Sequence, residues 1–443
     1  MQEPIREELM NELPQEGLPV TDASPLKLRQ QTHLPTKRVG FGFISAYAAV
    51  YVATSMAVLV PLVLTLALRI QQLDAAGKVG DLALVMAVGG IFVVLAGPFM
   101  GRLSDRTTWR LGMRRPFLLT GAILEASGLL MLAVAPALFV VLVSWCLVAI
   151  GSTAVLTAAN AVLPDQVPQE QRGLVSGVLG MTQGVGLIVG TFLVQAVVGS
   201  VLGMFVLPAL VALVSVLIFA VILPDRRLDP QQPLPSYNLG EFLHSFWVNP
   251  RRYPDFGWAW MGRFLVVMGM VTLTSYQVYY LIDHLHVSPR AVAGLIFLSI
   301  LISNIALMIA SHLSGWFSDK VRRRKPFVLI AALLYALGLL LVALAPTITA
   351  FLIAIAMTGI GQGVYMAIDL VLGAAVLPEG GREAGKDMSV FSIASTVPNT
   401  VAPAIAPLFL AIGGEGNYTA LFLAAALFAF LGALCTQPIK GVH

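Results

Sequence analysis

Charge is scarce in this sequence. Asp, Glu, Lys and Arg make up 11% of its 443 residues, against about 25% in an ordinary soluble domain. Apolar residues make up 58% of the chain, and the mean hydropathy is +0.85. These values exclude a soluble enzyme, a disordered chain and a nucleic-acid-binding domain. They predict an all-α membrane protein that crosses the bilayer several times.

Several functional motifs are also missing. The two cysteines, Cys146 and Cys435, fall inside apolar runs, so we expect no disulfide framework, metal site or cofactor. The first 40 residues hold no apolar run, which predicts a disordered cytoplasmic tail and no cleavable signal peptide. A Gly-x4-Gly-Lys-Ser/Thr loop is absent, so ATP is not the expected energy source. Within the apolar runs, His, Cys and Ser do not pair with acids at catalytic spacing, so an enzyme is not expected.

Long apolar runs dominate what remains. A helix needs about 20 apolar residues to cross a bilayer, and the sequence predicts twelve such spans, at about 42–68, 82–101, 117–135, 137–163, 173–195, 201–223, 257–283, 290–315, 327–345, 347–377, 388–413 and 418–437. Of the 27 Lys and Arg residues, 23 fall on the side of the N-terminus, 3 on the other side, and Arg263 inside a span. Because cytoplasmic loops carry an excess of Lys and Arg, this bias predicts a multi-pass plasma-membrane protein with both termini in the cytoplasm.

The spans form two related halves. A proline-rich linker at 224–256, in which an apolar face at 239–247 predicts a short interfacial helix, separates a bundle at 41–223 from one at 257–437, and residues 438–443 form a cytoplasmic C-terminus. The same short motifs recur in order at offsets of 214, 210 and 214 residues: Leu103–Arg106 with Phe317–Lys320, Leu132–Pro136 with Leu341–Pro346, and Ala161–Pro164 with Ala375–Pro378. Two parallel six-helix repeats are typical of one large transporter class, whose site lies between the halves.

The loops after the second and eighth spans carry a family resemblance. The first reads Gly101-Arg102-Leu103-Ser104-Asp105-Arg106 and continues to Arg110, Gly112, Arg114 and Arg115; the second reads Gly315-Trp316-Phe317-Ser318-Asp319-Lys320 and continues through Arg322 and Arg323. With Asp165 and Arg172 after the fourth span, this pattern resembles the major facilitator superfamily over residues 40–437. The first loop is longer by four residues and is similar to that of sucrose–proton and glycoside–cation symporters. The second loop departs from the family pattern, because Arg322 stands where the family usually has glycine.

The resemblance implies a gate at the cytoplasmic mouth. In such a gate Asp105 and Asp319 dock on the N-terminal end of a helix in the opposite half, where the helix dipole attracts anions. The arginines of the first loop would bridge to Asp165 or Glu170 when the mouth closes; alternatively they only fix the topology. The candidate gate comprises Gly101, Asp105, Arg106, Arg110, Gly112, Arg114, Arg115, Asp165, Arg172, Asp319, Lys320, Arg322 and Arg323.

Three charged residues lie inside spans, where each costs about 2.5–3.5 kcal/mol. Arg263 and Asp369 lie at similar depth on the seventh and tenth spans, which the resemblance places on the central cavity, so we expect an ion pair or a shared site for substrate or proton. Polar residues share helix faces near them. The candidate substrate or proton pathway comprises Glu125, Asn160, Arg263, Gln277, Gln362, Tyr365 and Asp369.

Two polar positions allow alternatives. Glu125 has Tyr335 as its repeat counterpart, which favours proton coupling; third spans are peripheral in this superfamily, which favours a structural hydrogen bond. Tyr279 and Tyr280 are expected in the outer aromatic belt rather than in the cavity.

The sequence therefore predicts a secondary transporter for a small solute such as a sugar or glycoside, coupled to protons and working by alternating access. The alternative in the same class is a proton-coupled efflux pump for drugs or metabolites, and a remote alternative is a non-transporting nutrient receptor. The expected partners are a small-molecule substrate, protons and the lipid bilayer, with no nucleic acid and no ATP. We expect a monomer.

Overall fold

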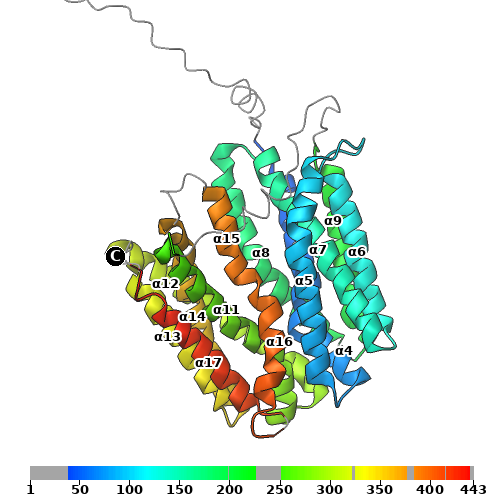
Figure 1. The fold of residues 1–443 in the computed structure, drawn as a ribbon. Helices are drawn as coiled ribbons and strands as arrows, with labels where there is room; N and C mark the ends of the chain where they lie inside the picture. The colour runs from blue at the N-terminus through cyan, green and yellow to red at the C-terminus, as the bar shows by residue number, and fades with distance from the viewer. Residues whose placement is uncertain are drawn as a thin grey trace, which may run out of the picture.

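The chain folds into a bundle of long helices (Figure 1). The computed structural model describes residues 38–197, 199–225, 251–321, 325–376, 384–414 and 416–439. Within these ranges eleven helices are long and apolar enough to cross a membrane, and the shorter apolar helix α17 adds a twelfth segment. The predicted fold class of twelve helices in two six-helix bundles is confirmed. The predicted tail and the interfacial helix at 239–247 lie outside the described residues.

The first half holds six spans. Its first span continues through Pro61, although this proline has no N–H to donate to an ordinary helical hydrogen bond. The chain passes it in a single wider π turn, so the helix is not interrupted. The last helix begins at a true cap, where the Ser200 hydroxyl accepts a hydrogen bond from the Gly203 N–H at 3.1 Å. The elements are α3 (Phe41–Val60), η1 (Pro61–Thr65), α4 (Leu66–Leu73), α5 (Lys78–Asp105), α6 (Arg115–Val134), α7 (Leu138–Gln166), α8 (Gln169–Ala196) and α9 (Val201–Ile222).

The second half repeats this plan. The eleventh span of the chain is divided at Val397, directly before the proline that begins α16. A proline disfavours the helical backbone conformation in the residue that precedes it. The Asn417 side chain caps the last helix by accepting from the Ala420 N–H at 2.9 Å. The elements are α11 (Pro254–Tyr279), η2 (Tyr280–His284), α12 (Pro289–Val321), α13 (Lys325–Ala343), α14 (Ile348–Ala375), α15 (Ala384–Thr396), α16 (Pro398–Leu410) and α17 (Tyr418–Leu434).

The same close helix packing recurs in both halves. A Cβ on Gly151 of α7 would lie 2.4 Å from the backbone nitrogen of Glu125 on α6, and a Cβ on Gly361 of α14 would lie 2.5 Å from that of Tyr335 on α13. Both members of the second pair lie 210 positions after those of the first. Small residues let membrane helices approach backbone to backbone, so this repeat motif fixes how the third and fourth spans of each half pack.

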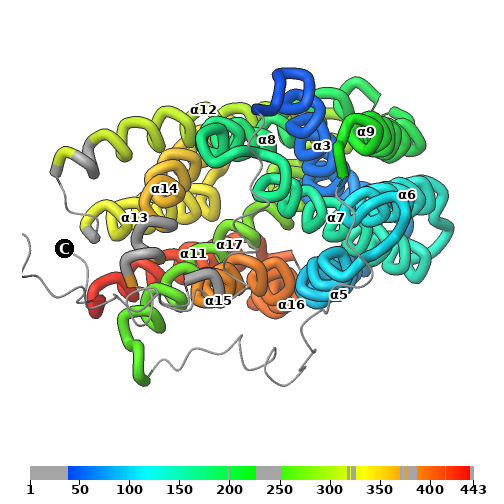
Figure 2. The backbone as a smooth tube through the Cα atoms, turned by 90° about the horizontal axis from the view of Figure 1, so that it is seen from above, coloured from blue at the N-terminus to red at the C-terminus, as the bar shows by residue number. Residues whose placement is uncertain are grey.

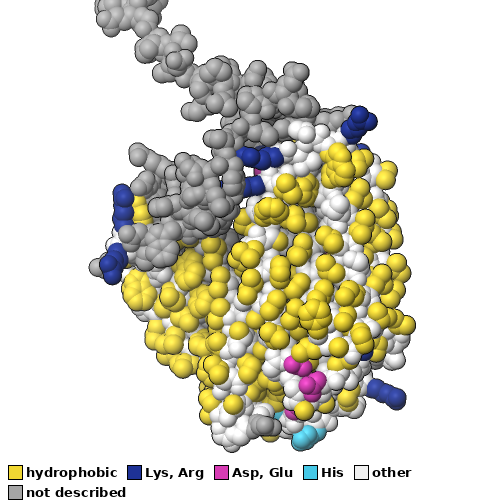
Figure 3. Space-filling view, turned by 45° about the vertical axis from the view of Figure 1, so that its right-hand side comes forward, with side chains coloured by type: hydrophobic (Ala, Val, Ile, Leu, Met, Phe, Trp, Pro, Cys, Tyr) yellow, Lys and Arg dark blue, Asp and Glu magenta, His cyan; other side chains and the backbone are white. Residues whose placement is uncertain are grey.

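The two halves lie side by side and touch through a few helices. Seen from above, α5 runs beside α16 and α8 beside α12 (Figure 2). Hydrophobic side chains cover the middle of the molecule, and Lys and Arg side chains gather at one end (Figure 3). We call this the basic end; it carries the loop between α5 and α6 with Arg106, Arg110, Arg114 and Arg115. The opposite end carries the loop between α4 and α5 and the segment η2.

Candidate functional site

Arg263 and Asp369 form an ion pair inside the membrane-spanning part of the second half. Arg263 lies nine residues into α11 and Asp369 six residues before the end of α14, so both lie about 10–14 Å in from the basic end. Their Nη1 and Oδ2 atoms are 2.6 Å apart, and the two side chains are 13% and 6% exposed. The structure thus brings together the two charges that the sequence places at similar depth. Each offsets the cost of burying the other.

The surroundings of the pair come from α14 and α15. Tyr365, one turn before Asp369, hydrogen-bonds to its carboxylate. The ring of Phe391 on α15 lies 4.7 Å from the guanidinium carbon of Arg263, and the Ser395 hydroxyl lies 3.3 Å from its Nη2. Neither Phe391 nor Ser395 was a candidate from the sequence, because their approach depends on how α15 packs against α11.

The first half carries a matching polar pair on the equivalent helices. The Tyr51 hydroxyl of α3 donates a hydrogen bond to the Asn160 Oδ1 of α7 at 2.6 Å. One turn away, the Tyr47 hydroxyl donates to the carbonyl of Ala159 at 2.5 Å. Asn160 is exposed, although it lies about 9 Å inside its helix from the basic end. Since exposed polar groups at membrane depth line water-filled cavities rather than lipid, we expect this pair to border a cavity.

Two predicted pathway residues lie farther along their helices. Gln362 is half-buried and lies on α14 about 10 Å from Asp369 toward the opposite end. Gln277 is buried and lies about 21 Å beyond Arg263 in the same direction. Gln277 therefore belongs to a different level of the bundle from the ion pair.

Glu125 is set apart from this group. It is fully buried, and neither carboxylate oxygen has a hydrogen-bond partner among the residues that the structure describes. Its helix α6 packs against α7 and α9 of the same half. The described residues thus offer no partner for the structural hydrogen bond that is one of the two predicted roles of Glu125.

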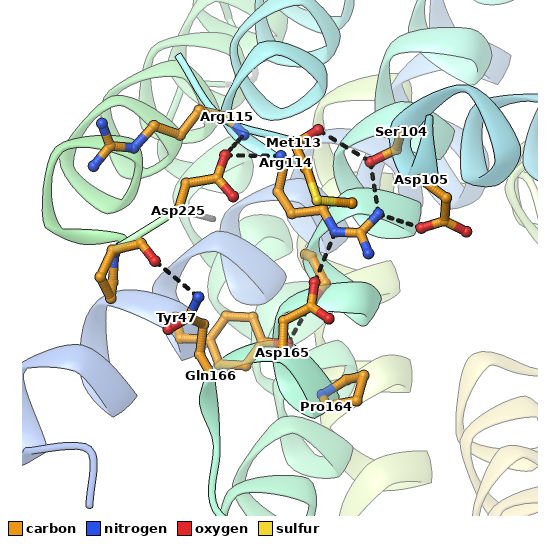
Figure 4. A network of polar contacts seen from close by, with 12 residues as sticks. Tyr47, Ser104, Asp105, Met113, Arg114, Arg115, Pro164, Asp165, Gln166 and Asp225 are labelled. Atoms are coloured by element: carbon orange, nitrogen blue, oxygen red, sulfur yellow. Dashed lines mark hydrogen bonds and ion pairs between the residues drawn. The ribbon is translucent and has the colours of Figure 1, made fainter. Parts of the chain in front are cut away.

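Arg114 is the hub of an ion-pair network at the basic end (Figure 4). Its Nη1 lies 2.6 Å from the Asp105 carboxylate and 2.9 Å from the Ser104 hydroxyl, and its Nε lies 2.9 Å from the Asp165 carboxylate. Burial of Arg114 opposes its charge, but the hydrogen bonds and charges of Asp105 and Asp165 outweigh burial and raise its pKa. The network ties the ends of α5 and α7 to the start of α6.

A residue that sequence reasoning missed completes this end. The Asp225 carboxylate, after α9, accepts hydrogen bonds from the backbone N–H groups of Arg114 and Arg115, both at 2.8 Å. It thereby caps α6, where the helix dipole favours an anion. Gly112 has a φ of +109°, and a Cβ there would lie 2.2 Å from the Asp225 carboxylate, so this turn requires glycine.

The other gate candidates have separate positions. The Arg115 guanidinium donates to the carbonyl of Leu223 at the end of α9. Arg172 donates to the carbonyls of Val167 and Pro164 at 3.1 Å each and so closes the turn between α7 and α8. The remaining candidates are placed as follows: Gly101 against Thr157 of α7, Arg106 and Arg110 exposed, Lys320 exposed over the Trp316 ring, and the Asp319 side chain with Arg322 and Arg323 outside the described residues.

The expected docking of Asp105 on the opposite half is not what the structure displays. Its carboxylate is 62% exposed and pairs with Arg114 of its own half. The arginine network therefore works within one half in this state of the protein.

Contacts between the halves are concentrated at the opposite end. Lys78, which begins α5, forms an ion pair at 2.7 Å with Asp283 of η2, and the other oxygen of Asp283 accepts from the Tyr418 hydroxyl at 2.6 Å. Tyr279 of α11 donates to the carbonyl of Ala67 on α4 at 3.0 Å. The links from Lys78 to Asp283 and from Tyr279 to Ala67 join segments more than 200 positions apart, which is why no local sequence signal indicates them.

The expectation of an aromatic belt for Tyr279 and Tyr280 is wrong. Both side chains are fully buried. The Tyr280 hydroxyl lies 2.8 Å from the carbonyl of Val342 and 3.0 Å from that of Ala345, so it anchors η2 to the end of α13. Tyr279 ends α11 and Tyr280 begins η2, and both side chains pack inside the protein rather than at the lipid surface.

Two repeated six-helix bundles, with a buried ion pair in one and a closed contact between them at one end, define a polytopic membrane transporter. The sequence profile of the Major Facilitator Superfamily matches residues 39–314 and 302–439, and the chain belongs to that superfamily. It is accordingly a transporter and not an enzyme. A search of curated proteins found no match.

Solved structures share this fold at low sequence identity. A bacterial homolog of the human lysosomal transporter Spinster, in an inward-facing and unoccupied conformation, is 17% identical with a TM-score of 0.67 and is covered over 98% of its length by 90% of this chain. The nucleoside transporter NupG is 14% identical with a TM-score of 0.70, with 90% of this chain covering 99% of it. The peptide transporter POT in complex with alafosfalin is 14% identical with a TM-score of 0.67, with 93% of this chain covering 97% of it. At these identities the likeness extends to the fold alone.

Proposed function

We propose that the protein is a proton-coupled secondary transporter that binds a small polar solute between the Arg263–Asp369 pair and the Tyr51–Asn160 pair. The observation that carries this proposal is the buried ion pair on α11 and α14. Charged residues inside membrane spans mark substrate and ion pathways. The second polar pair lies at similar depth on the equivalent helices of the other half, as a site between two repeats requires.

The contacts at the opposite end support alternating access. Lys78–Asp283 and the Tyr279 hydrogen bond hold the two halves together there, while Asp105 at the basic end pairs within its own half. If the basic end faces the cytoplasm of a plasma-membrane protein, as the 23 Lys and Arg residues on that side favour, this is a state closed to the outside. Both termini would then be cytoplasmic. Each half is complete within one chain, in line with a monomer.

Two carboxyl groups are candidates for the proton. Asp369 would lose its ion pair with Arg263 when it takes up a proton and regain the pair when it releases the proton. Glu125 has no hydrogen-bond partner among the described residues and would keep its proton through the transport cycle. The neutral substitutions Asp369→Asn and Glu125→Gln separate them. The substitution at the coupling group removes the dependence of solute flux on a pH gradient, and the other leaves that dependence in place.

Flux into vesicles tests the proposal. The purified protein is reconstituted in proteoliposomes, and uptake of labelled sucrose, glucose and a phenyl glycoside is measured with and without an inward proton gradient. Gradient-driven accumulation of a sugar supports symport, as the loop resemblance to sucrose and glycoside symporters favours. Exchange of protons for an amphiphilic dye would instead support the efflux alternative. Binding without flux would support a receptor and overturn the transport proposal.

A further inference from the structure

The Arg263 guanidinium has an unused edge. Its Nη1 lies 2.6 Å from Asp369, but within the described part of the chain neither Nη1 nor Nε makes an aligned hydrogen bond, and both atoms are buried. Nη2 reaches a single hydroxyl, that of Ser395, at a long 3.3 Å. Asp369 thus balances the charge of Arg263 without satisfying its donors. Buried donors without acceptors are rare in folded proteins.

The geometry around the guanidinium limits how a ligand can reach it. The Phe391 ring covers one face at 4.7 Å from the guanidinium carbon, and Asp369 occupies the Nη1 end. The edge formed by Nε and Nη2 remains; in this state its Nε is buried and its Nη2 contacts Ser395, while the side chain as a whole is 13% exposed. Two parallel N–H groups on such an edge match the two coplanar oxygens of a carboxylate or one side of a phosphate.

We propose that the transported solute carries a carboxylate or phosphate group and that this group binds the Nε–Nη2 edge of Arg263. This inference rests on the proposed transport function and names the class of its substrate. A neutral hydroxyl can also accept from these N–H groups, but it lacks the charge that makes each hydrogen bond to a carboxylate or phosphate stronger. The exposed amide of Asn160 in the other half supplies a contact for the rest of the solute, which a hydroxylated body would use.

Electrostatics adds a condition to this binding. A second anion beside Arg263 would be repelled by the Asp369 carboxylate, so neutralising Asp369 strengthens binding. A further acid, the buried Asp387, begins α15 two turns nearer the basic end than Ser395. Tyr365, which hydrogen-bonds to Asp369, is uncharged and imposes no such repulsion.

The test measures thermal unfolding of the purified full-length protein against matched ligands. The pairs are glucuronate with glucose, benzoate with benzamide, and glucose 6-phosphate with glucose, so the panel separates carboxylate from phosphate recognition. We expect at least one anion, and none of the neutral partners, to raise the melting temperature. Arg263→Lys keeps the charge but loses the paired edge, and should weaken that binding by about tenfold or more. Asp369→Asn should tighten it. Arg290→Lys, which changes an exposed arginine at the opposite end, should leave it unchanged.

Three results would overturn the inference: equal stabilisation by a neutral partner, a response that Arg263→Lys leaves unchanged, or no stabilisation by any anion in the panel. Proteoliposome flux distinguishes this failure from failure of the transport proposal. Proton-driven glucose uptake that survives Arg263→Lys would leave transport standing and remove the anion site. Anion binding through Arg263 without flux of any bound ligand would leave the anion site standing and contradict the transport proposal.

Discussion

The ion pair between Lys78 and Asp283 is a direct target for shifting the conformational equilibrium. It joins the two halves at the opposite end, and the side chains are 13% and 31% exposed. Exposed pairs contribute about 0.2–1 kcal/mol, and losing one partner of a buried pair costs about 3–5 kcal/mol. A half-buried pair falls between these limits, at about 1–2 kcal/mol. Lys78→Met should therefore raise the population open at this end by about 5–30-fold relative to the closed one.

The chain offers a matched control for this substitution. Asp283 also accepts a hydrogen bond from Tyr418, which belongs to its own half. Tyr418→Phe removes a contact to the same carboxylate without breaking the link between halves. Lys78→Met should thus open this end, and Tyr418→Phe should leave it closed.

Distance measurements between spin labels read out the opening. Labels at Ala137 and Thr347 mark equivalent exposed turns of the two halves at the opposite end, in a background where the buried Cys146 and Cys435 are replaced by alanine. We expect Lys78→Met to increase the fraction of long distances. An unchanged distribution, or the same increase in Tyr418→Phe, would refute the assignment of this pair as the link that holds the halves closed.

Three further predictions concern the ion pairs and the helix packing. Asp369→Leu leaves Arg263 charged without its partner and should lower stability by about 3–5 kcal/mol, whereas exchanging the two residues in a double variant should restore stability; a double variant as unstable as the single one contradicts direct pairing. Gly151→Ala places a Cβ 2.4 Å from a backbone nitrogen and should lower the melting temperature, while Gly177→Ala, with nothing within 4 Å, should be neutral or stabilising; equal effects in thermal unfolding would argue against the tight packing. Arg114→Gln removes the cation between two aspartates and should destabilise the basic end, seen as faster hydrogen exchange there; unchanged exchange would show that the network contributes little.

Much of the fold was predictable because the bilayer constrains each helix by itself. A span must be long, apolar and internally hydrogen-bonded, so the run of apolar residues that ends near Val134 and the next that starts near Leu138 mark two spans without reference to any partner. The short motifs that recur at offsets of 214 and 210 residues then showed that the chain consists of two related halves. Arg263 and Asp369 were predictable for the same reason, since a charge inside a span requires a partner at its own depth.

Contacts that depend on how the helices rotate and where the halves meet were decided by the tertiary structure alone. Arg114 rather than its three neighbouring arginines became the hub, because it is the side chain that packs between Asp105 and Asp165. Lys78 and Asp283 stand 205 positions apart, at the start of α5 and within η2, and no distinguishing sequence pattern marks either residue. Hydropathy and charge counts describe one helix against its solvent, whereas a link between two halves exists only once both are packed. The sequence by itself determined a two-half membrane bundle with a charged pair inside it. The tertiary structure determined which end holds the halves together and which side chains surround Arg263.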